Sequence, residues 1–214
     1  RHARVRGEDY DAFVDRFVQA VQKNFPHAMI HWEDFGAGNA HRILDKYRGE
    51  VCSFNDDIQG TAAVVVAAIL AAVRRSGQRL VDQRIVVHGA GTAGIGIADL
   101  LVQRMVNRGI PRERALACFW GLGSRGLLRE GISMRDFQEP YARTAAELAA
   151  WPLDDPSKVE LADVVRNVHP TIIIGTSAQA GAFSETIIKD MAAHCERPII
   201  MPLSNPTRKA EALP

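Results

Sequence analysis

A short strand that runs directly into a glycine-rich loop is the feature that most constrains the fold of this chain. The β-branched segment Arg84–His88 is followed by a GxGxxG pattern, Gly89-Ala90-Gly91-Thr92-Ala93-Gly94, and an apolar helix is expected from there to about Asn107. In such a unit the first glycine makes the tight turn, the second lets a pyrophosphate approach, and the third lets helix and strand pack closely. The helix start offers free N–H groups and a positive dipole end to phosphates. The pattern predicts dinucleotide binding, with a bare tight turn as the alternative.

Strands and helices alternate along the rest of the sequence. Short apolar strands are expected at residues 28–32, 51–54, 115–120, 171–174 and 199–201, and helices at 8–25, 40–47, 59–75, 161–167 and 184–193. This alternation predicts an α/β fold with a parallel, doubly wound sheet covered on both faces. The helix at 59–75 is apolar all round, so it should be buried. Residues 133–156 carry several prolines and indicate a long irregular connection.

Composition excludes some classes of function. The 214 residues carry a net charge of +1, from 26 Lys and Arg against 25 Asp and Glu, which gives no reason to expect nucleic acid or an anionic membrane as a partner. The longest apolar run, Ala62–Val73, is too short to span a bilayer, and no signal peptide is visible. The distant cysteines Cys52, Cys118 and Cys195 are expected to be buried, in a reducing compartment. Because no methionine begins the chain, we expect a fragment of a longer protein.

Two acidic pairs follow apolar strands. Glu33-Asp34 comes after one strand and Asp56-Asp57 after the next, so both pairs are expected at the carboxyl edge of a sheet. Three oxygen ligands from such a cluster, completed by water and substrate oxygens, suit Mg²⁺ or Mn²⁺. Helix capping is the alternative, because Asp57 precedes the helix at 59–75 and could be its N-cap. Both roles are compatible.

Polar residues follow two other strands. The strand after the glycine loop has no carboxylate at its tip; Ser124 and Arg125 stand there, and they suit a 2′-phosphate better than a bare ribose diol. The alternative is a solvated arginine in a glycine-rich loop. Asn205 lies in the segment Leu203–Thr207, after the strand at 199–201. It is either part of a turn or a ligand of a substrate carboxylate or of the nicotinamide ribose.

Several segments together resemble the malic enzymes, in the order and spacing of that family. They are WEDFG (32–36), SFNDDIQGTAAV (53–64), GAGTAGIGIA (89–98), RGLL (125–128), VVRNVHPTIIIGTS (164–177) and PLSNPT (202–207). NDDIQGT is far more specific than the glycine loop, and the resemblance covers nearly the whole chain. It is closest to the bacterial and mitochondrial-like large-subunit type.

The resemblance implies a domain organisation and a reaction. Residues 1–56 would be the C-terminal part of a substrate- and metal-binding domain, a helical and strand segment. Residues 57–214 would be a Rossmann-type NAD(P)-binding domain. The family decarboxylates malate oxidatively to pyruvate and CO₂ with NAD or NADP and Mg²⁺ or Mn²⁺. A cytoplasmic enzyme that forms homodimers or homotetramers at full length is implied as well.

The resemblance also implies roles for single residues. Glu33, Asp34 and Asp57 would be the metal ligands, and Asp56 a neighbouring carboxylate with a proton-transfer or structural role. Thr61 and the Gly89–Thr92 turn would contact the dinucleotide. Asn205 would contact malate and the nicotinamide end of the cofactor.

The sequence also departs from the family pattern. Gly123 replaces the ribose-binding aspartate, and Arg125 stands where NADP-preferring relatives have a lysine, so both NAD and NADP stay open. The family's general base, a lysine, and its general acid, a tyrosine, belong to segments before Glu8. We therefore expect the chain alone to bind cofactor without turning over malate. A malolactic enzyme, a metal-independent amino-acid dehydrogenase and a non-catalytic nucleotide-sensing module are the alternatives.

Overall fold

Two compact units divide the chain. The computed structural model describes residues 3–153 and 155–213, and the units are Arg1–Asp56 and Asp57–Pro214. The two acidic pairs lie at and before the boundary between the units, and the glycine loop falls in the second unit. Each unit is described by itself.

The first unit has two helices and a pair of short strands. Its elements are α1 (Glu8–Asn24), β1 (Ile30–Trp32), α2 (Ala37–Tyr47) and β2 (Ser53–Asn55). The strands pair in parallel, with Ile30 opposite Ser53 and Trp32 opposite Asn55. A small core of Val14, Val18, Ile30, Trp32, Ile43 and Tyr47 holds the unit together. Because the strands are parallel and in register, both end at the same edge.

The second unit contains a five-stranded sheet in the order β5-β4-β3-β6-β7. The strands are β3 (Ile85–His88), β4 (Phe119–Gly123), β5 (Gly126–Leu127), β6 (Ile172–Gly175) and β7 (Ile199–Pro202). All pairs are parallel except β4 with β5. Since β3 pairs with both β4 and β6, the strand order reverses between β3 and β6, and a crevice at this switch point is where such sheets bind ligands. The expected parallel, doubly wound sheet is confirmed.

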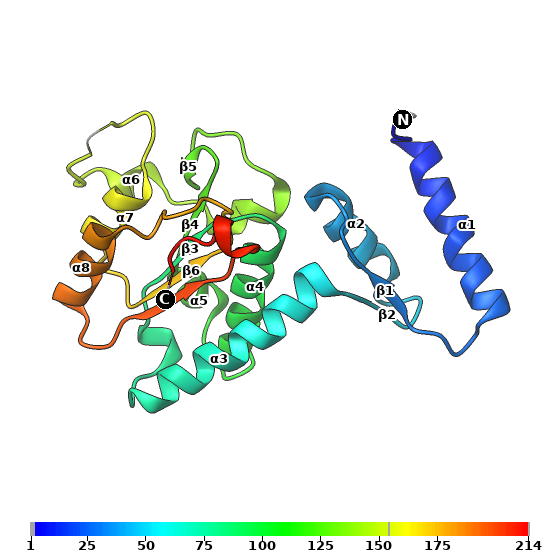
Figure 1. Cartoon of the computed structure of the whole chain (residues 1–214), viewed down its shortest axis with the longest axis horizontal. Coiled ribbons are helices and arrows are strands. Elements are labelled where there is room, and N and C mark those ends of the chain that lie inside the picture. Colours follow the sequence, from blue (N-terminus) through cyan, green and yellow to red (C-terminus); the bar gives the residue numbers. More distant parts are fainter. Residues whose placement is uncertain (1–2, 154, 214) are drawn as a thin grey trace. The chain divides into compact units, whose positions relative to one another are not determined.

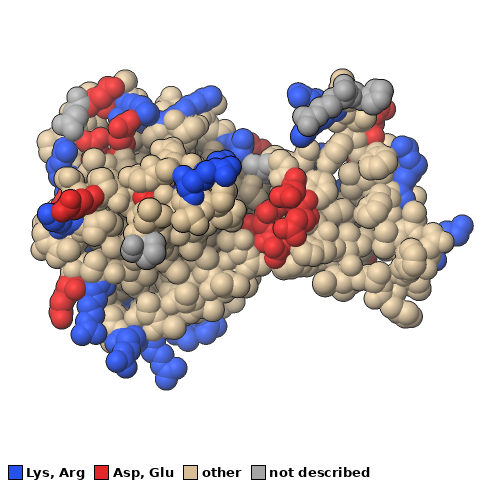
Figure 2. All heavy atoms as spheres, in the orientation of Figure 1, with Lys and Arg blue, Asp and Glu red and all other residues tan. Residues whose placement is uncertain are grey.

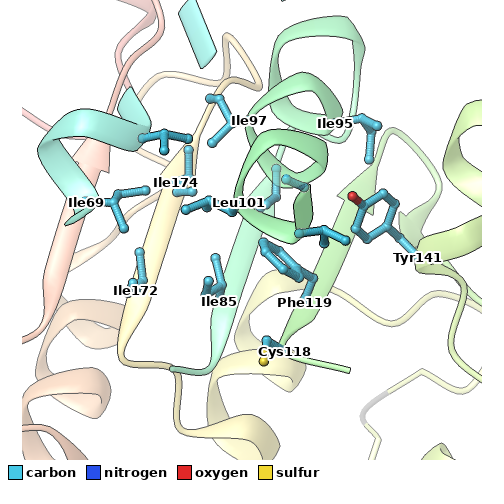
Figure 3. Packing of buried hydrophobic residues seen from close by; sticks show 14 of the residues in the cluster. Ile69, Ile85, Ile95, Ile97, Leu101, Cys118, Phe119, Tyr141, Ile172 and Ile174 are labelled. Carbon is cyan, nitrogen blue, oxygen red and sulfur yellow. The ribbon is translucent and has the colours of Figure 1, made fainter. Parts of the chain in front are cut away.

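Helices cover both faces of this sheet (Figure 1). They are α3 (Thr61–Arg75), α4 (Thr92–Val106), α5 (Arg112–Leu116), α6 (Ala145–Leu148), α7 (Leu161–Val168) and α8 (Glu185–His194), with 3₁₀ turns at Leu80–Asp82, Asp136–Tyr141 and Thr207–Lys209. Successive residues of β3 face opposite sides. Ile85 and Val87 pack with α3 and α4, as Figure 3 shows for Ile85, Ile69 and Leu101. Val86 belongs instead to the core shared with α7 and α8.

Some expectations were wrong in detail. The strand expected at residues 115–120 begins only at Phe119, because Ala115 and Leu116 end the short helix α5. An apolar run of this length has the same appearance in a helix and in a strand, so periodicity cannot separate them. Of the cysteines, Cys118 is buried as expected, but Cys52 is exposed and Cys195 half-buried.

Helix α3 is not buried all round. Ile69 is fully buried against α4 and the sheet, whereas Val64 on the opposite side is 73% exposed. With the π-helical turn before it (Asp56–Gly60), α3 forms a helical segment of 20 residues, which by length and composition alone could cross a membrane. Its buried side chains belong to the main core of the sheet.

Candidate functional site

The turn after β3 lies directly against the turn after β6. Gly89 has φ 109°, and a Cβ there would lie 2.3 Å from the Thr176 carbonyl carbon and 2.5 Å from the Ser177 nitrogen. The Thr176 hydroxyl donates a 2.6 Å hydrogen bond to the Gly89 carbonyl. Both the conformation and the close approach exclude any side chain at this position.

The other two glycines of the loop have different surroundings. A Cβ at Gly94 would lie 2.3 Å from the Gly89 oxygen and 2.9 Å from Val87 Cγ1, so α4 packs onto β3 only because Gly94 lacks a side chain. Around a Cβ at Gly91 no described atom lies within 4 Å. No side chain of the described residues caps α4, which begins at Thr92. An open backbone at a helix N-terminus fits a pyrophosphate, so the residues present fit a dinucleotide.

A cavity of about 520 Å³ extends from this loop to the tip of β4. Gly89, Ala90, Gly91, Ser124 and Arg125, all expected as cofactor residues, line it. Two hydrogen bonds tie the segment after β5 to this cavity. Arg125 Nη1 donates to the Ser133 carbonyl at 3.1 Å, and Gln138 Nε2 donates to the Ala90 carbonyl at 2.5 Å. Thr92 and Gly94 follow in α4, and Thr61 begins α3.

His88 also lines the cavity, although sequence reasoning did not select it. Its side chain lies at the end of β3, and its buried ring nitrogens have no partner of normal hydrogen-bond geometry in the described chain. Burial lowers the pKa of His88, opposed by the negative charge of Glu211 and by Gln179. The imidazole is therefore neutral at physiological pH.

In the first unit, the parallel strands bring two acidic side chains together. Glu33 and Asp56 directly follow the paired residues Trp32 and Asn55. Carboxylate oxygens of Glu33 and Asp56 and a ring nitrogen of His31 lie within 4.8 Å of one another, and His31 Nε2 is 3.1 Å from Glu33 Oε2. Figure 2 shows a compact group of acidic side chains on the face in view. Two carboxylates and an imidazole form a donor set that fits a divalent cation.

The remaining two expected ligands lie on either side of the unit boundary. Asp34 follows Glu33 and has φ 57°, a left-handed conformation that aspartate tolerates better than most residues. Asp57 lies in the second unit, in the π-helical turn before α3. It stays a prediction that one ion is bound by Glu33, Asp34 and Asp57. Capping by Asp57 at the N-cap of α3 is not observed, because Gly60 occupies that position.

The turn that carries Asp57 packs against α4, the helix that follows the glycine loop. A Cβ at Gly96, in the second turn of α4, would lie 2.9 Å from the Ile58 carbonyl oxygen. π-helical turns are rare and are frequently found at functional sites. Within the second unit, the chain next to Asp57 is therefore close to the helix that starts at the glycine loop.

The loops after β6 and β7 are joined by a buried carboxylate that sequence reasoning missed. Glu211 is fully buried and accepts hydrogen bonds from Ser177 and Ser204, the latter next to Asn205. Burial would raise the pKa of Glu211, but these hydrogen bonds outweigh burial and lower it. A Cβ at Gly175 would lie 2.6 Å from the Glu211 carboxyl carbon, so this glycine leaves room for the carboxylate.

Comparison with known families decides the assignment. The family described as "Malic enzyme, NAD binding domain" matches residues 58–214, and "Malic enzyme, N-terminal domain" matches residues 1–48. The chain belongs to the malic enzyme family. Its glycine loop and parallel sheet are thus those of the family's NAD-binding domain.

Similar proteins have long stretches that this chain does not contain. The chain is 49% identical over 216 residues to NAD-dependent malic enzyme 3 of Bacillus subtilis and 47% identical over 215 residues to an NAD-dependent malic enzyme of Photorhabdus laumondii. In both cases all of this chain and 38% of the relative are covered, so the chain spans about two fifths of these malic enzymes. The solved NAD-dependent malic enzyme of Thermotoga maritima superimposes with TM-score 0.67 at 25% identity, covering 93% of this chain and 48% of that one.

Proposed function

We propose that this chain is the cofactor- and metal-binding part of an enzyme that oxidatively decarboxylates malate to pyruvate and CO₂ with NAD and a divalent cation. The observation that carries the proposal is the glycine loop. At Gly89 and Gly94 close contacts leave no room for a side chain. At Gly91 the space is free, as a bound pyrophosphate requires. Family membership supports the reaction, and the names of the relatives support NAD.

NAD is favoured over NADP by the surroundings of Arg125 as well. Its guanidinium already donates to the Ser133 carbonyl, so part of its hydrogen-bonding capacity is used within the protein. Gly123 at the tip of β4 leaves room beside the ribose but offers it no carboxylate. Use of NADP, with Arg125 and Ser124 on the 2′-phosphate, is the alternative.

Each group in this chain then has a limited task. When bound, NAD would accept the C2 hydride of malate, and Mg²⁺ or Mn²⁺ would supply Lewis-acid stabilisation of negative charge at the C2 oxygen. The Gly89–Thr92 turn holds the pyrophosphate, and Thr61 contacts the dinucleotide. Glu33, Asp34 and Asp57 hold the cation next to Asp56, and Asn205 orients the malate carboxylate. General acid and base groups are assigned to no residue of this chain.

Further properties follow as parts of the same proposal. The whole enzyme works as a homodimer or homotetramer in the cytoplasm, with malate and pyruvate as its small-molecule partners and no nucleic acid or membrane. Light scattering of the full-length protein checks its oligomeric state. Product analysis separates this reaction from the malolactic alternative, which would yield lactate in place of pyruvate and NADH.

Calorimetric titration of the chain with NAD⁺, with and without Mn²⁺, tests the nucleotide site. Gly91→Val should lower NAD⁺ affinity at least tenfold, because the side chain enters the space of the pyrophosphate, while the melting temperature stays close to that of the wild type. Gly49→Val, which also points into open space but lies in the first unit, is the matched control. Unchanged NAD⁺ affinity in Gly91→Val would overturn the assignment. Production of NADH from malate by the isolated chain would contradict the division of tasks.

A further inference from the structure

Two histidines and an aspartate meet at the edge of the sheet opposite the glycine loop. His169 is the C-cap of α7, just before β6, and Asp190 and His194 lie in the last turns of α8, before β7. These positions precede the amino ends of the strands, whereas the nucleotide site follows their carboxyl ends. One ligand atom from each of the three residues lies within 4.8 Å of the others.

The backbone on both sides of this cluster is fixed. The His169 N–H donates to the Val165 carbonyl, and the His169 carbonyl accepts a 2.7 Å hydrogen bond from Arg84 Nε. On α8, the four-residue spacing places Asp190 and His194 on one face, where His194 Nδ1 is 3.5 Å from Asp190 Oδ1. The core shared by α7 and α8 keeps the two helices together. The fold therefore holds the backbone of the three residues in place.

The two imidazoles stack face to face, with ring centroids 3.7 Å apart and planes 16° from parallel. His169 Nδ1 is buried and has no hydrogen-bond partner among the described residues. A buried ring nitrogen without a hydrogen-bond partner is costly, whether or not it carries a proton. The stacked rings also present two nitrogen donors next to one carboxylate oxygen.

We propose that His169, Asp190 and His194 form a binding site for a late transition-metal ion of the Zn²⁺ class, separate from the carboxylate site for Mg²⁺ or Mn²⁺. Imidazole donors favour Zn²⁺ and its neighbours, whereas all-oxygen sites favour Mg²⁺ and Mn²⁺. Zinc–nitrogen bonds of roughly 2.0–2.1 Å place tetrahedral donors about 3.4 Å apart, so from separations within 4.8 Å the ligand atoms must close in by up to about 1.4 Å. His194 and Asp190 are 42% and 31% exposed and can rotate to do so.

The fourth ligand position has access to solvent. A cavity of about 600 Å³ lies at this edge and is lined by His194, Cys195 and Thr171, among others. Water can therefore complete the coordination. A bound ion would join the loop before β6 to the end of α8 and so stabilise the folded second unit by mass action.

Titration of the metal-free chain with Zn²⁺, and with Co²⁺ followed by visible absorption, tests the site. We expect one equivalent with the intense d–d bands of tetrahedral Co²⁺ and a higher melting temperature with Zn²⁺. His194→Ala and Asp190→Asn should each weaken binding at least tenfold. His169→Asn should do the same, because asparagine tolerates the left-handed conformation of that residue, φ 49°.

His31→Ala is the matched control, because His31 belongs to the other cluster of possible ligands. It should leave the Co²⁺ spectrum unchanged, and His194→Ala should leave NAD⁺ affinity unchanged. Loss of the bands in His31→Ala but not in His194→Ala would assign the ion to the first unit and overturn the proposal. So would Zn²⁺ binding that is equal in the wild type and all three variants. Circular dichroism of each variant identifies any that fails to fold.

Discussion

Ser204 donates a 2.6 Å hydrogen bond from its hydroxyl to Oε1 of Glu211. The same carboxylate oxygen accepts from the N–H and the hydroxyl of Ser177, each at 2.8 Å. Ser177 belongs to the loop after β6, beside the proposed NAD site, and Ser204 belongs to the loop after β7, next to Asn205. One buried carboxylate thus fixes the positions of two loops at the proposed active site.

Replacing Glu211 by Gln should destabilise the second unit by about 1–3 kcal/mol, because an amide cannot accept all of these hydrogen bonds. The pKa of Glu211 is lowered below 4.5 in the folded protein. A group of this kind adds stability above its unfolded pKa and loses it as the pH falls through its folded pKa. The difference in the free energy of unfolding between wild type and Glu211→Gln should therefore be largest at pH 7 and shrink below about pH 4.5. Urea unfolding across this pH range measures it, and exposed Glu196→Gln is the control.

Gly175→Ala should be destabilising for a related reason. The added methyl group would lie 2.6 Å from the Glu211 carboxyl carbon, and Glu211 is held by its hydrogen bonds and cannot move away freely. Overpacking of this kind costs about 1–3 kcal/mol. The shorter side chain in Glu211→Asp should relieve part of the clash, so the two substitutions should be less than additive in urea unfolding. Strict additivity would show that the clash lies elsewhere.

The sequence predicted the parts of this site that depend on local pattern. A β-branched strand followed by GxGxxG identifies the turn, and the contacts of Gly89 and Gly94 agree with the roles expected for them. Glu211 could not be found in this way, since Ser177 lies 34 residues away and the two meet only through the register of β6 and β7. The end of the chain around Glu211 carries no periodicity that marks it as buried.

Other features were missed for different physical reasons. His88 continues a β-branched strand, and only the folded sheet shows that it lines a cavity. The helix α5 was mistaken for the start of a strand because Ala115 and Leu116 continue the apolar run into β4. The uniformly apolar sequence of α3 predicted a helix buried on all sides, but one side is exposed. Hydrophobicity alone does not show which face of a helix is covered.

Tyr141 should make stability sensitive to alkaline pH. Its hydroxyl donates a 2.7 Å hydrogen bond to Asp99 Oδ1 from within the main core (Figure 3), and burial, together with the charge of Asp99, raises the pKa of Tyr141. The unfolded chain loses the Tyr141 proton at a lower pH than the folded protein does. The free energy of unfolding therefore falls as the pH rises above about 10. Tyr141→Phe should lower the free energy of unfolding by about 1–2 kcal/mol at pH 7. The decline at alkaline pH should be smaller in this variant than in the wild type. Urea unfolding at pH 7 to 11 measures both effects. An equal decline in the two proteins would show that other groups cause it.

Replacing Arg125 by Ala tests whether this residue distinguishes NADP⁺ from NAD⁺. If its guanidinium reads a 2′-phosphate, Arg125→Ala should weaken NADP⁺ binding about tenfold or more, since a hydrogen bond to a charged group is worth about 1.5–3 kcal/mol. NAD⁺ affinity should then change by less than about twofold. Arg135→Ala, from the same cavity, is the matched control for loss of positive charge. Equal losses for NAD⁺ and NADP⁺ would instead mean that Arg125 acts through its 3.1 Å hydrogen bond to Ser133, by holding the wall of the cavity in place.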